Sequence, residues 1–370
     1  MNILLTGVTG ILGSQILYDL LYLFIKNNSN GQIFLPVRTS KKSGKERVKS
    51  LLNDDVLPDK LKSSDLKDFW PYIHVIECDL QDLNEKHFES FGIKNCYLIH
   101  TAASTNLDSS DKVKSEIYSS NYLLTLQLLE VSKKFICKFI FISTAYSCGI
   151  RSGVIDDDFL SLQQCEYRNP YENFKAQIEK EIVSFCESKN IEWQIMRPSI
   201  ICGRLLKSPL YFISKFNVFY SYLKFFYKSL PLEMKEFPIR ICLHRDSHMN
   251  LVPVDLVAQA ITNNFLDPEI KQLNIVGEDI EVHWIVEHIF AISKLRRFEF
   301  INETPDKQNP LEKIYYSSIH SIFGKYMNSP KLFYKKNKII EPFTEKLDIK
   351  KQFTNLSQFA IEQNFKNCKW

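Results

Sequence analysis

The stretch Thr6-Gly7-Val8-Thr9-Gly10-Ile11-Leu12-Gly13 decides the fold that this sequence predicts. It follows an apolar run at residues 2–5, which is typical of a buried strand, and it opens a segment to residue 25 with helical spacing of its apolar positions. Glycines between a strand and a helix let the backbone turn tightly, approach a pyrophosphate and pack the helix on the strand. The amino end of the helix then attracts the anion. The pattern therefore predicts a dinucleotide-binding turn, with a purely structural turn as the alternative.

Short apolar runs alternate with longer helical patterns from the amino terminus to about residue 197. This alternation predicts an α/β fold with a doubly wound parallel sheet of the Rossmann type. The predicted strands lie at residues 2–5, 32–37, 72–77, 97–100, 139–143 and 193–196. After residue 203 this regular alternation of strand and helix patterns ends. We therefore expect an NAD(P)-binding domain over 1–203 and a smaller C-terminal substrate region over 204–370, part of which rejoins the sheet near 250–277.

Charge and cysteine content exclude several classes of protein. The 47 basic and 43 acidic residues give a charge of +4, spread along the chain, which argues against a nucleic-acid partner. Nine cysteines without a Cys-x-x-Cys pair are expected to be reduced core residues in a cytoplasmic protein. No uncharged stretch reaches about 18 residues, so no transmembrane segment is predicted, although peripheral membrane contact stays open. His244 and His248 flank Asp246, but no third ligand is evident and no metal is predicted.

The residue at the end of the second predicted strand bears on the choice of cofactor. An acidic residue there would bind a ribose 2′-hydroxyl, whereas this sequence reads Pro36-Val37-Arg38-Thr39, with Lys41 and Lys42 following. A guanidinium can pair with a 2′-phosphate. We therefore expect NADP(H), with NAD(H) as the second choice. A solvated basic loop is the alternative role of these cations.

The sequence contains Tyr-x-x-x-Lys five times, and on a helix this spacing places a phenol and an ammonium on one face. Only Tyr171 with Lys175 begins a helical segment between the fifth and sixth predicted strands, which puts this pair at the carboxyl edge of the sheet. We expect Tyr171 to donate a proton and Lys175 to lower the pKa of the phenol from about 10. The other pairs, expected to lie on helix surfaces, begin at Tyr22, Tyr211, Tyr220 and Tyr334.

Two hydroxyl residues, Ser143 and Thr144, follow the fifth predicted strand. Strand alternation sends their side chains to opposite sides, so only one of them can face the site. The facing hydroxyl is expected to hydrogen bond to the substrate oxygen and to stabilise developing negative charge. The alternative for this hydroxyl, Tyr171 and Lys175 is a coincidental set of core and surface residues.

Taken together, these motifs resemble the extended short-chain dehydrogenase/reductase superfamily, and within it the thioester reductase and fatty acyl-CoA reductase branch. The resemblance covers about residues 1–277. It rests on the glycine turn, Val37-Arg38, Ser143-Thr144-Ala145-Tyr146, Asn169-Pro170-Tyr171-Glu172 with Lys175, Arg197-Pro198-Ser199-Ile200-Ile201 and Val252-Pro253-Val254-Asp255. Cys78, where the family usually has glycine, and Phe174, where it often has a small residue, depart from the pattern.

The resemblance implies catalytic roles for Thr144, Tyr171 and Lys175, and it selects Thr144 over Ser143. It places Asp79 near the adenine. Together with the glycine turn and Arg38, it gives as cofactor-binding residues Thr6, Gly7, Thr9, Gly10, Ile11, Leu12, Gly13, Arg38, Asp79, Leu80, Thr101, Ala102, Ala103, Asn121, Tyr171, Lys175, Pro198, Ser199 and Ile200.

An aromatic-rich segment follows at residues 208–230, after the alternation of strand and helix patterns has ended. Between residues 212 and 230 its apolar side chains fall on one side of a helical wheel, which predicts an amphipathic helix. This helix could pack on its own domain, form a lid over a long apolar substrate, or rest on a membrane. The apolar positions are Phe212, Phe216, Phe219, Tyr220, Leu223, Phe226 and Tyr227, and the polar ones are Asn217, Ser221, Lys224 and Lys228.

These expectations lead to one hypothesis and two rivals. The hypothesis is an NADPH-dependent reductase that converts an acyl-CoA or carrier-protein thioester to an aldehyde or alcohol, so that its partners are a small-molecule or acyl-thioester substrate and, in one version, a carrier protein. The first rival is a nucleotide-sugar epimerase or dehydratase with tightly held NAD. The second is a non-catalytic dinucleotide-binding protein.

Overall fold

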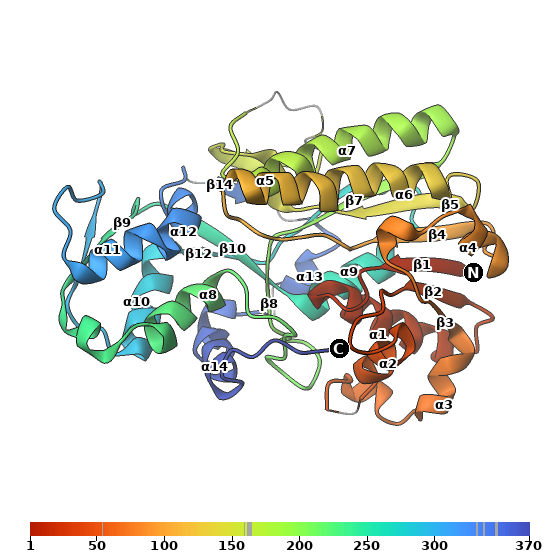
Figure 1. The fold of residues 1–370 in the computed structure, drawn as a ribbon, viewed down its shortest axis with the longest axis horizontal. Helices are drawn as coiled ribbons and strands as arrows, with labels where there is room; N and C mark the ends of the chain where they lie inside the picture. The colour runs from red at the N-terminus through yellow and green to blue at the C-terminus, as the bar shows by residue number, and fades with distance from the viewer. Residues whose placement is uncertain (54, 159, 161–164, 331, 336, 345–346) are drawn as a thin grey trace.

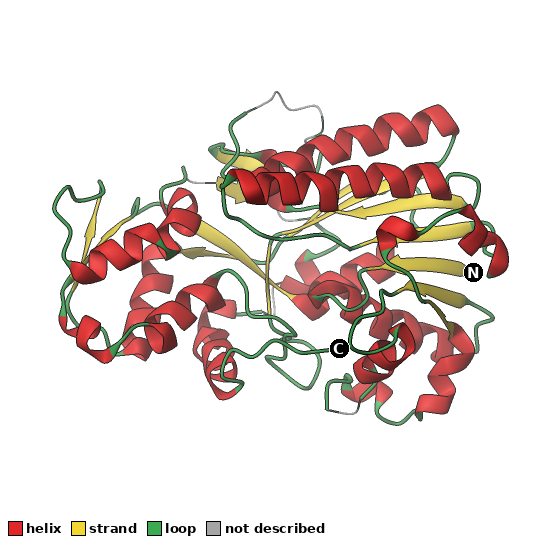
Figure 2. Ribbon diagram, in the orientation of Figure 1, coloured by secondary structure: helices red, strands yellow, loops and turns green. Residues whose placement is uncertain are grey.

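The computed structural model describes residues 1–53, 55–158, 160, 165–330, 332–335, 337–344 and 347–370. Its central feature is a seven-stranded sheet with the order β11-β7-β5-β4-β1-β2-β3, in which every neighbouring pair is parallel. Helices cover both faces of this sheet (Figures 1 and 2). The predicted α/β fold with a doubly wound parallel sheet is therefore confirmed.

All the predicted strands are present in the sheet, with small shifts of their ends. They are β1 (Asn2–Thr6), β2 (Gln32–Pro36), β3 (Ile73–Ile76), β4 (Cys96–His100), β5 (Ile136–Ile142) and β7 (Glu192–Pro198). The strand β11 (Gln272–Ile275) comes from the later part of the chain and pairs with β7. The chain steps outward from β1 to β3 and then returns to the other side of β1. The loops after β1 and β4 therefore diverge, and a ligand crevice is expected between them.

The apolar side chains of the strands pack into two separate layers, one on each face of the sheet. Ile3 and Leu5 of β1 lie in the layer formed with α1 (Ile11–Lys26), α2 (Gly44–Leu51) and α9 (Val254–Asn264). Leu4 lies in the opposite layer with α4 (Glu85–Ser90), α6 (Leu124–Ser132) and α7 (Pro170–Lys189). Helix α5 (Asp111–Ile117) and the π-helix η4 (Tyr118–Leu123) precede α6 on this second face. Because successive side chains of a strand point to opposite faces, a continuous apolar run fills both layers.

The second region has an apolar core of its own, at the left of Figure 1. One sheet in it has the order β12-β10-β8, while β9 pairs with β13, and β14 pairs with β6 from the first region. The helices of the second region surround this core, whereas α9 and β11 return to the first layer. The strands are β6 (Gly153–Ile155), β8 (Ile200–Cys202), β9 (Ile239–Cys242), β10 (His248–Pro253), β12 (Glu278–Glu281), β13 (Phe298–Ile301) and β14 (Leu332–Tyr334). The longer helices are α10 (Val282–Ser293), α11 (Pro310–Ser317), α12 (Ile319–Met327) and α14 (Ile349–Glu362).

Short helical turns connect these elements. The two short α-helices among them are α3 (Leu66–Phe69) and α13 (Glu341–Thr344). The 3₁₀ turns are η1 (Asp59–Leu61), η2 (Trp70–Tyr72), η3 (Leu80–Asp82), η5 (Ala145–Cys148) and η7 (Leu232–Glu236).

The predicted amphipathic helix over residues 212–230 is wrong in extent. Helix α8 spans only Phe219–Lys224 and continues as the π-helix η6 (Phe225–Ser229), and no helix precedes it after residue 203. Val218 has a positive φ of 51°, outside the right-handed helical region, so the helix cannot begin before it. Of the predicted apolar positions, all but Tyr227 are buried. The segment therefore packs on its own domain, the first of the three roles considered.

Candidate active site

The glycine turn joins β1 to α1 where the strand order reverses. Gly7 has a φ of +72°, and a Cβ at this position would lie 2.7 Å from the Ala102 backbone nitrogen. A Cβ on Gly13 would lie 2.3 Å from the Gly7 carbonyl oxygen, so α1 packs against the turn only because no side chain is present. No side chain caps the amino end of α1, which begins after Gly10. Its first backbone N–H groups are therefore available to a phosphate.

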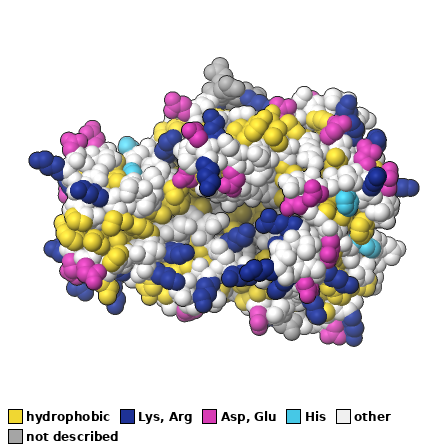
Figure 3. Space-filling model, viewed as in Figure 1, with side chains coloured by type: hydrophobic (Ala, Val, Ile, Leu, Met, Phe, Trp, Pro, Cys, Tyr) yellow, Lys and Arg dark blue, Asp and Glu magenta, His cyan; other side chains and the backbone are white. Residues whose placement is uncertain are grey.

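A cleft of about 840 Å³ opens beside this turn, at the carboxyl ends of β1, β2 and β4. Figure 3 shows a hollow at the centre of this face, with Lys and Arg side chains gathered around it. Its volume lies in the range of small-molecule and cofactor sites. The predicted cofactor residues that line the cleft are Gly7, Thr9, Gly10, Arg38, Asp79, Leu80, Thr101, Ala102 and Ala103. Sequence reasoning missed the far wall, formed by residues of α5, η4 and α6, and also Arg47 and Lys215.

The remaining predicted cofactor residues do not line this cleft. Thr6 is buried, with its hydroxyl oxygen 2.8 Å from His100 Nδ1. Asn121 lies in η4, where its side chain accepts from the Ser104 backbone nitrogen at 2.8 Å and donates to the Ser104 carbonyl oxygen at 2.9 Å. These two residues therefore fix the strand ends and the loop that border the cleft. The others are Ile11, Leu12, Gly13, Tyr171, Lys175, Pro198, Ser199 and Ile200.

Three cations border the cleft on the side of β2. Arg47 donates from Nη1 to the Arg38 carbonyl oxygen at 2.8 Å and from Nη2 to Thr9 Oγ1 at 3.3 Å. Burial and the charges of Arg38 and Arg47 lower the pKa of Lys215. Burial and the charge of Arg38 likewise lower the pKa of Arg47. Because these like charges repel one another, an anion placed between them is favoured.

Helix α7 carries Tyr171 in its first turn and Lys175 one turn later. Asn169 caps the helix, since its Oδ1 accepts from the Glu172 backbone nitrogen at 3.0 Å, and Pro170 follows at the first helical position. Lys175 is buried and donates from Nζ to the carbonyl oxygen at the end of β5, Ile142 O, at 2.7 Å. Its Nζ lies 5.9 Å from the centroid of the Tyr171 ring. Position in the sequence thus identified a pair that the structure brings together beside β5.

The pKa of the Tyr171 phenol shifts in the direction opposite to the predicted lowering. Burial and the charge of Glu172 raise the pKa of Tyr171 above its ordinary value. Burial lowers the pKa of Lys175 itself to about 7, although the charge of Glu179 opposes this shift. Desolvation disfavours the charged form of both groups and is the largest cause of each shift. The phenol is therefore held protonated, as a proton donor requires.

The structure distinguishes the two hydroxyl residues after β5. Both residues are buried, and the Ser143 hydroxyl donates to the Glu179 carboxylate. Thr144 Oγ1 accepts from the Tyr146 backbone nitrogen at 3.3 Å, an interaction that leaves the threonine proton for another acceptor. The choice of Thr144 over Ser143 as the donor to the substrate oxygen stays a prediction.

A buried ion pair that sequence reasoning missed supports this part of the site. Glu179, one turn beyond Lys175 on α7, accepts from Arg197 Nη2 at 2.8 Å and from Ser147 Oγ at 2.7 Å. Both members of the Arg197–Glu179 pair are at most 2% exposed. The pair ties α7 to β7, and the available signal was a glutamate spaced i+4 from Lys175.

Three of the four other Tyr-x-x-x-Lys pairs differ from their predicted helix-surface placement. The pair that begins at Tyr22 does lie on α1, but Tyr220 of α8 is fully buried. Tyr211 lies outside any helix and Tyr334 lies in β14, so neither can form a helical i,i+4 pair. Lys215, the lysine of the Tyr211 match, lines the cofactor cleft instead.

The described residues hold no group of three or more His, Cys, Asp or Glu side chains placed to bind a metal ion. All nine cysteines are free thiols, and five of them are buried. Among the helices that the structure describes, none is both long and apolar enough to cross a bilayer.

A model of a known protein family, described as male sterility protein, matches residues 5–261 of this chain. No curated protein matches the sequence.

Solved structures resemble the whole chain in fold. The terminal R domain from the myxalamid PKS-NRPS biosynthetic pathway has a TM-score of 0.67 at 18% identity, covering 100% of this chain and 92% of that domain. UDP-glucuronic acid 4-epimerase from Bacillus cereus, in complex with UDP-glucuronic acid and NAD, has a TM-score of 0.62 at 17% identity. The match covers 98% of this chain and 100% of the epimerase chain. dTDP-glucose 4,6-dehydratase from Bacillus anthracis, in complex with NAD, has a TM-score of 0.60 at 14% identity, covering 99% and 100%. At these identities the likeness concerns the fold alone.

Proposed function

The chain belongs to the male sterility protein family of the extended short-chain dehydrogenase/reductase superfamily, and from this premise we propose that it reduces an acyl thioester with hydride from NADPH. Membership of this superfamily makes it an NAD(P)-dependent oxidoreductase. The observation that carries the proposal is the arrangement of Tyr171, Lys175 and Thr144 around the end of β5, next to the strand end that borders the dinucleotide cleft. The acyl group would arrive as a CoA or carrier-protein thioester.

The residues of the cleft fit NADP(H). The glycine turn packs closely against the loop after β4 and against α1, because a Cβ on Gly7 or Gly13 would overlap neighbouring backbone atoms. The uncapped amino end of α1 would bind the pyrophosphate. Arg38, Arg47 and Lys215 would hold the 2′-phosphate, and their mutual repulsion would be relieved by its charge. No acidic residue occupies the end of β2, where NAD-binding proteins hold the ribose 2′-hydroxyl. We therefore propose NADP(H) as the preferred cofactor.

The chain's own residues would supply proton transfer and charge stabilisation. When bound, NADPH supplies the hydride to the carbonyl carbon of the thioester. Tyr171 Oη donates its proton to the carbonyl oxygen, and Thr144 Oγ1 donates a hydrogen bond to the same oxygen. The proton on this oxygen then passes to the sulfur as the C–S bond breaks, so that the thioester, one NADPH and one proton would give an aldehyde, a free thiol and NADP⁺. A second round gives the alcohol.

The aromatic segment 208–230 gives this proposal no support, because most of its apolar side chains are buried in the second core. Neither a lid nor a membrane-bound helix is needed to explain its composition. The substrate side of the proposal therefore rests on the family match and on the chemistry of Tyr171 and Thr144.

The test is NADPH oxidation by the purified chain with acyl-CoAs from short to long chain length, followed by mass spectrometric detection of aldehyde and alcohol. Parallel reactions with NADH measure the cofactor preference. We expect turnover with NADPH that exceeds turnover with NADH by about tenfold or more, the effect of one charge-assisted phosphate contact. Absence of turnover with every acyl-CoA and with an acyl carrier protein would contradict the proposal.

A nucleotide-sugar epimerase or dehydratase is the second candidate, because the fold likeness extends over the whole of such enzymes. Denaturing the purified protein and identifying any released nucleotide separates the two. Stoichiometric NAD together with conversion of a UDP-sugar or dTDP-sugar would favour the second candidate. If the protein only binds the dinucleotide and catalyses no reaction, Tyr171→Phe should leave its cellular function intact.

A further inference from the structure

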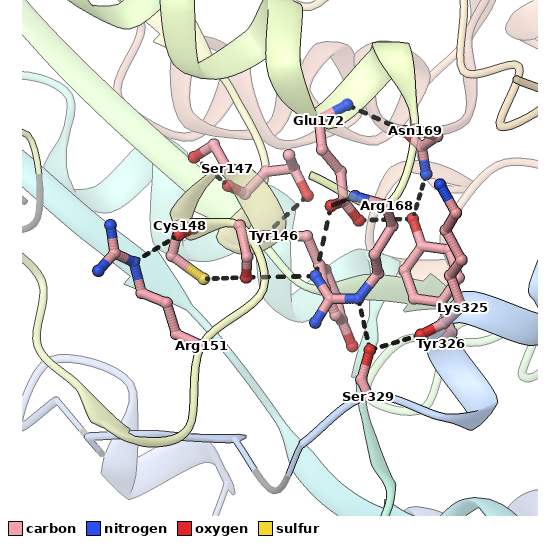
Figure 4. A network of polar contacts seen from close by, with 12 residues as sticks. Tyr146, Ser147, Cys148, Arg151, Arg168, Asn169, Glu172, Lys325, Tyr326 and Ser329 are labelled. Atoms are coloured by element: carbon pink, nitrogen blue, oxygen red, sulfur yellow. Dashed lines mark hydrogen bonds and ion pairs between the residues drawn. The ribbon is translucent and has the colours of Figure 1, made fainter. Parts of the chain in front are cut away.

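A buried tyrosine from the second region is bonded to the turn of α7 that carries Tyr171. Tyr326, near the end of α12, donates from its hydroxyl to Glu172 Oε1 at 2.6 Å. The same hydroxyl accepts from Asn169 Nδ2 at 2.8 Å. Pro170 and Tyr171 lie between these two partners in the chain, so the hydroxyl of Tyr326 holds both ends of the first helical turn (Figure 4).

A second contact reinforces the first. Arg168 Nη1 donates to Glu172 Oε2 at 3.3 Å, and Arg168 Nε donates to Ser329 Oγ at 2.8 Å. The guanidinium also lies over the ring of Tyr326, 5.3 Å from its centroid. Arg168 and Glu172 are at most 2% exposed, so the carboxylate depends on these partners for compensation of its charge. Two residues of the second region, Tyr326 and Ser329, thus contact the start of α7 through one buried network.

This network connects the substrate region with the proposed proton donor. Helix α12 belongs to the second core through Phe323 and Met327, and both lie beyond the residues that the family model matches. Tyr326 itself packs edge-on against Tyr146, with ring centroids 5.7 Å apart. The position of the first turn of α7 is therefore set from outside the cofactor-binding domain.

We infer that Tyr326 is a positioning residue that aims the phenol of Tyr171 at the reacting carbonyl. This inference rests on the proposed function, in which Tyr171 donates the proton. Tyr326 acts through Asn169 and Glu172 and touches no reacting atom. A displacement of about 1 Å at a reacting group costs on the order of 100-fold in rate, so the loss of this hydrogen bond should reduce turnover.

The test is Tyr326→Phe, which removes only the hydroxyl, compared with Tyr315→Phe. Tyr315 is the matched control, because it is also buried and its hydroxyl lies 3.2 Å from Tyr222 Oη and 3.1 Å from His320 Nδ1 within the second core. We expect both variants to lose a similar few degrees in Tm. Only Tyr326→Phe should lower kcat, by roughly 10- to 100-fold, with the Kd of NADPH and the KM of the acyl substrate changed less than about twofold.

Hydrogen exchange at the backbone amides of residues 171–175 gives a readout that needs no substrate. Tyr326→Phe should speed exchange there, whereas Tyr315→Phe should leave it unchanged. If the wild-type chain has no reductase activity, the proposed function fails and the exchange measurement alone decides the role of Tyr326. Unchanged exchange in Tyr326→Phe, or a kcat that falls equally in both variants, overturns the inference.

Discussion

The guanidinium of Arg47, on α2, donates to the backbone carbonyl oxygen of Arg38, just after β2, at 2.8 Å. This bond keeps a second cation at the end of the cleft where the 2′-phosphate of NADPH is proposed to lie. Arg47→Met should therefore raise the Kd of NADPH by roughly 10- to 100-fold, the value of a hydrogen bond to a charged group. The Kd of NADH, which has no 2′-phosphate, should change by less than threefold. Fluorescence titration with both nucleotides measures the two constants.

Lys41→Met is the control for Arg47→Met, because Lys41 is exposed and does not line the cleft. It removes the same charge from the same part of the chain. Equal weakening of NADPH and NADH by Arg47→Met would place Arg47 at the pyrophosphate, through its bond to Thr9, and would contradict the 2′-phosphate assignment.

Tyr171→Phe should abolish most of the turnover without loss of cofactor. A positioned general acid contributes about 10²- to 10⁴-fold, so kcat should fall within that range while the Kd of NADPH stays nearly constant. Tyr22→Phe offers a control with the same Tyr-x-x-x-Lys motif on a different helix, and it should retain wild-type kcat. Steady-state kinetics with an active acyl-CoA would decide the matter, and a Tyr171→Phe enzyme as fast as the wild type would remove the proton-donor role.

Thr144→Val and Ser143→Ala should have different consequences. The valine is nearly isosteric and removes the hydroxyl that is free to donate, so kcat should fall by about 10- to 1000-fold. It also removes the acceptor for the Tyr146 backbone nitrogen, which should lower the stability by about 1 kcal/mol. The alanine removes the bond from Ser143 to the buried Glu179 carboxylate, which should lower the stability by about 1–3 kcal/mol. Parallel measurement of kcat and of unfolding in urea separates the two effects. The reverse pattern, a slow Ser143→Ala enzyme with normal stability, would show that Ser143, and not Thr144, is the hydroxyl that contacts the substrate.

The sheet, the glycine turn and α7 could be predicted because each is encoded in a continuous stretch of sequence. A strand such as β1 shows itself by an unbroken apolar run, and the turn after it by glycines that only a close backbone approach requires. The choice of Tyr171 among the tyrosine–lysine pairs needed only the order of elements along the chain. Local pattern and chain order therefore sufficed for the fold and for the placement of the proposed proton donor.

Other parts of the site depend on contacts between distant segments. Lys215 and Tyr326 reach the first domain from the second region, and no local spacing relates them to Arg38 or Glu172. The predicted helix over residues 212–230 failed because Val218 adopts a positive φ that its residue type gives no reason to expect. The predicted lowering of the Tyr171 pKa failed because desolvation depends on how deeply the packed chain buries each group.

The buried ammonium of Lys175 should make the stability of the cofactor-free protein depend on pH. Its pKa is about 7 in the folded chain and near its ordinary value of 10.5 in the unfolded chain. Between these values the unfolded chain binds more protons, so the free energy of unfolding of the wild type should increase as the pH rises from 7 to 10.5. At or below pH 7 the folded chain bears the full cost of burying the charged ammonium. This cost is on the order of a few kcal/mol, since one pKa unit corresponds to about 1.4 kcal/mol.

Lys175→Met cannot titrate and should lack this contribution. Losing the bond to Ile142 O adds a constant offset, so the informative quantity is the difference in unfolding free energy between variant and wild type as a function of pH. This difference should favour the variant most near pH 7 and should shrink by a few kcal/mol as the pH approaches 10. Lys180→Met, which removes an exposed lysine from the same helix, should show a difference that hardly varies with pH. Urea unfolding at several pH values measures all three proteins, and parallel curves for Lys175→Met and the wild type would show that Lys175 is not desolvated in the folded chain.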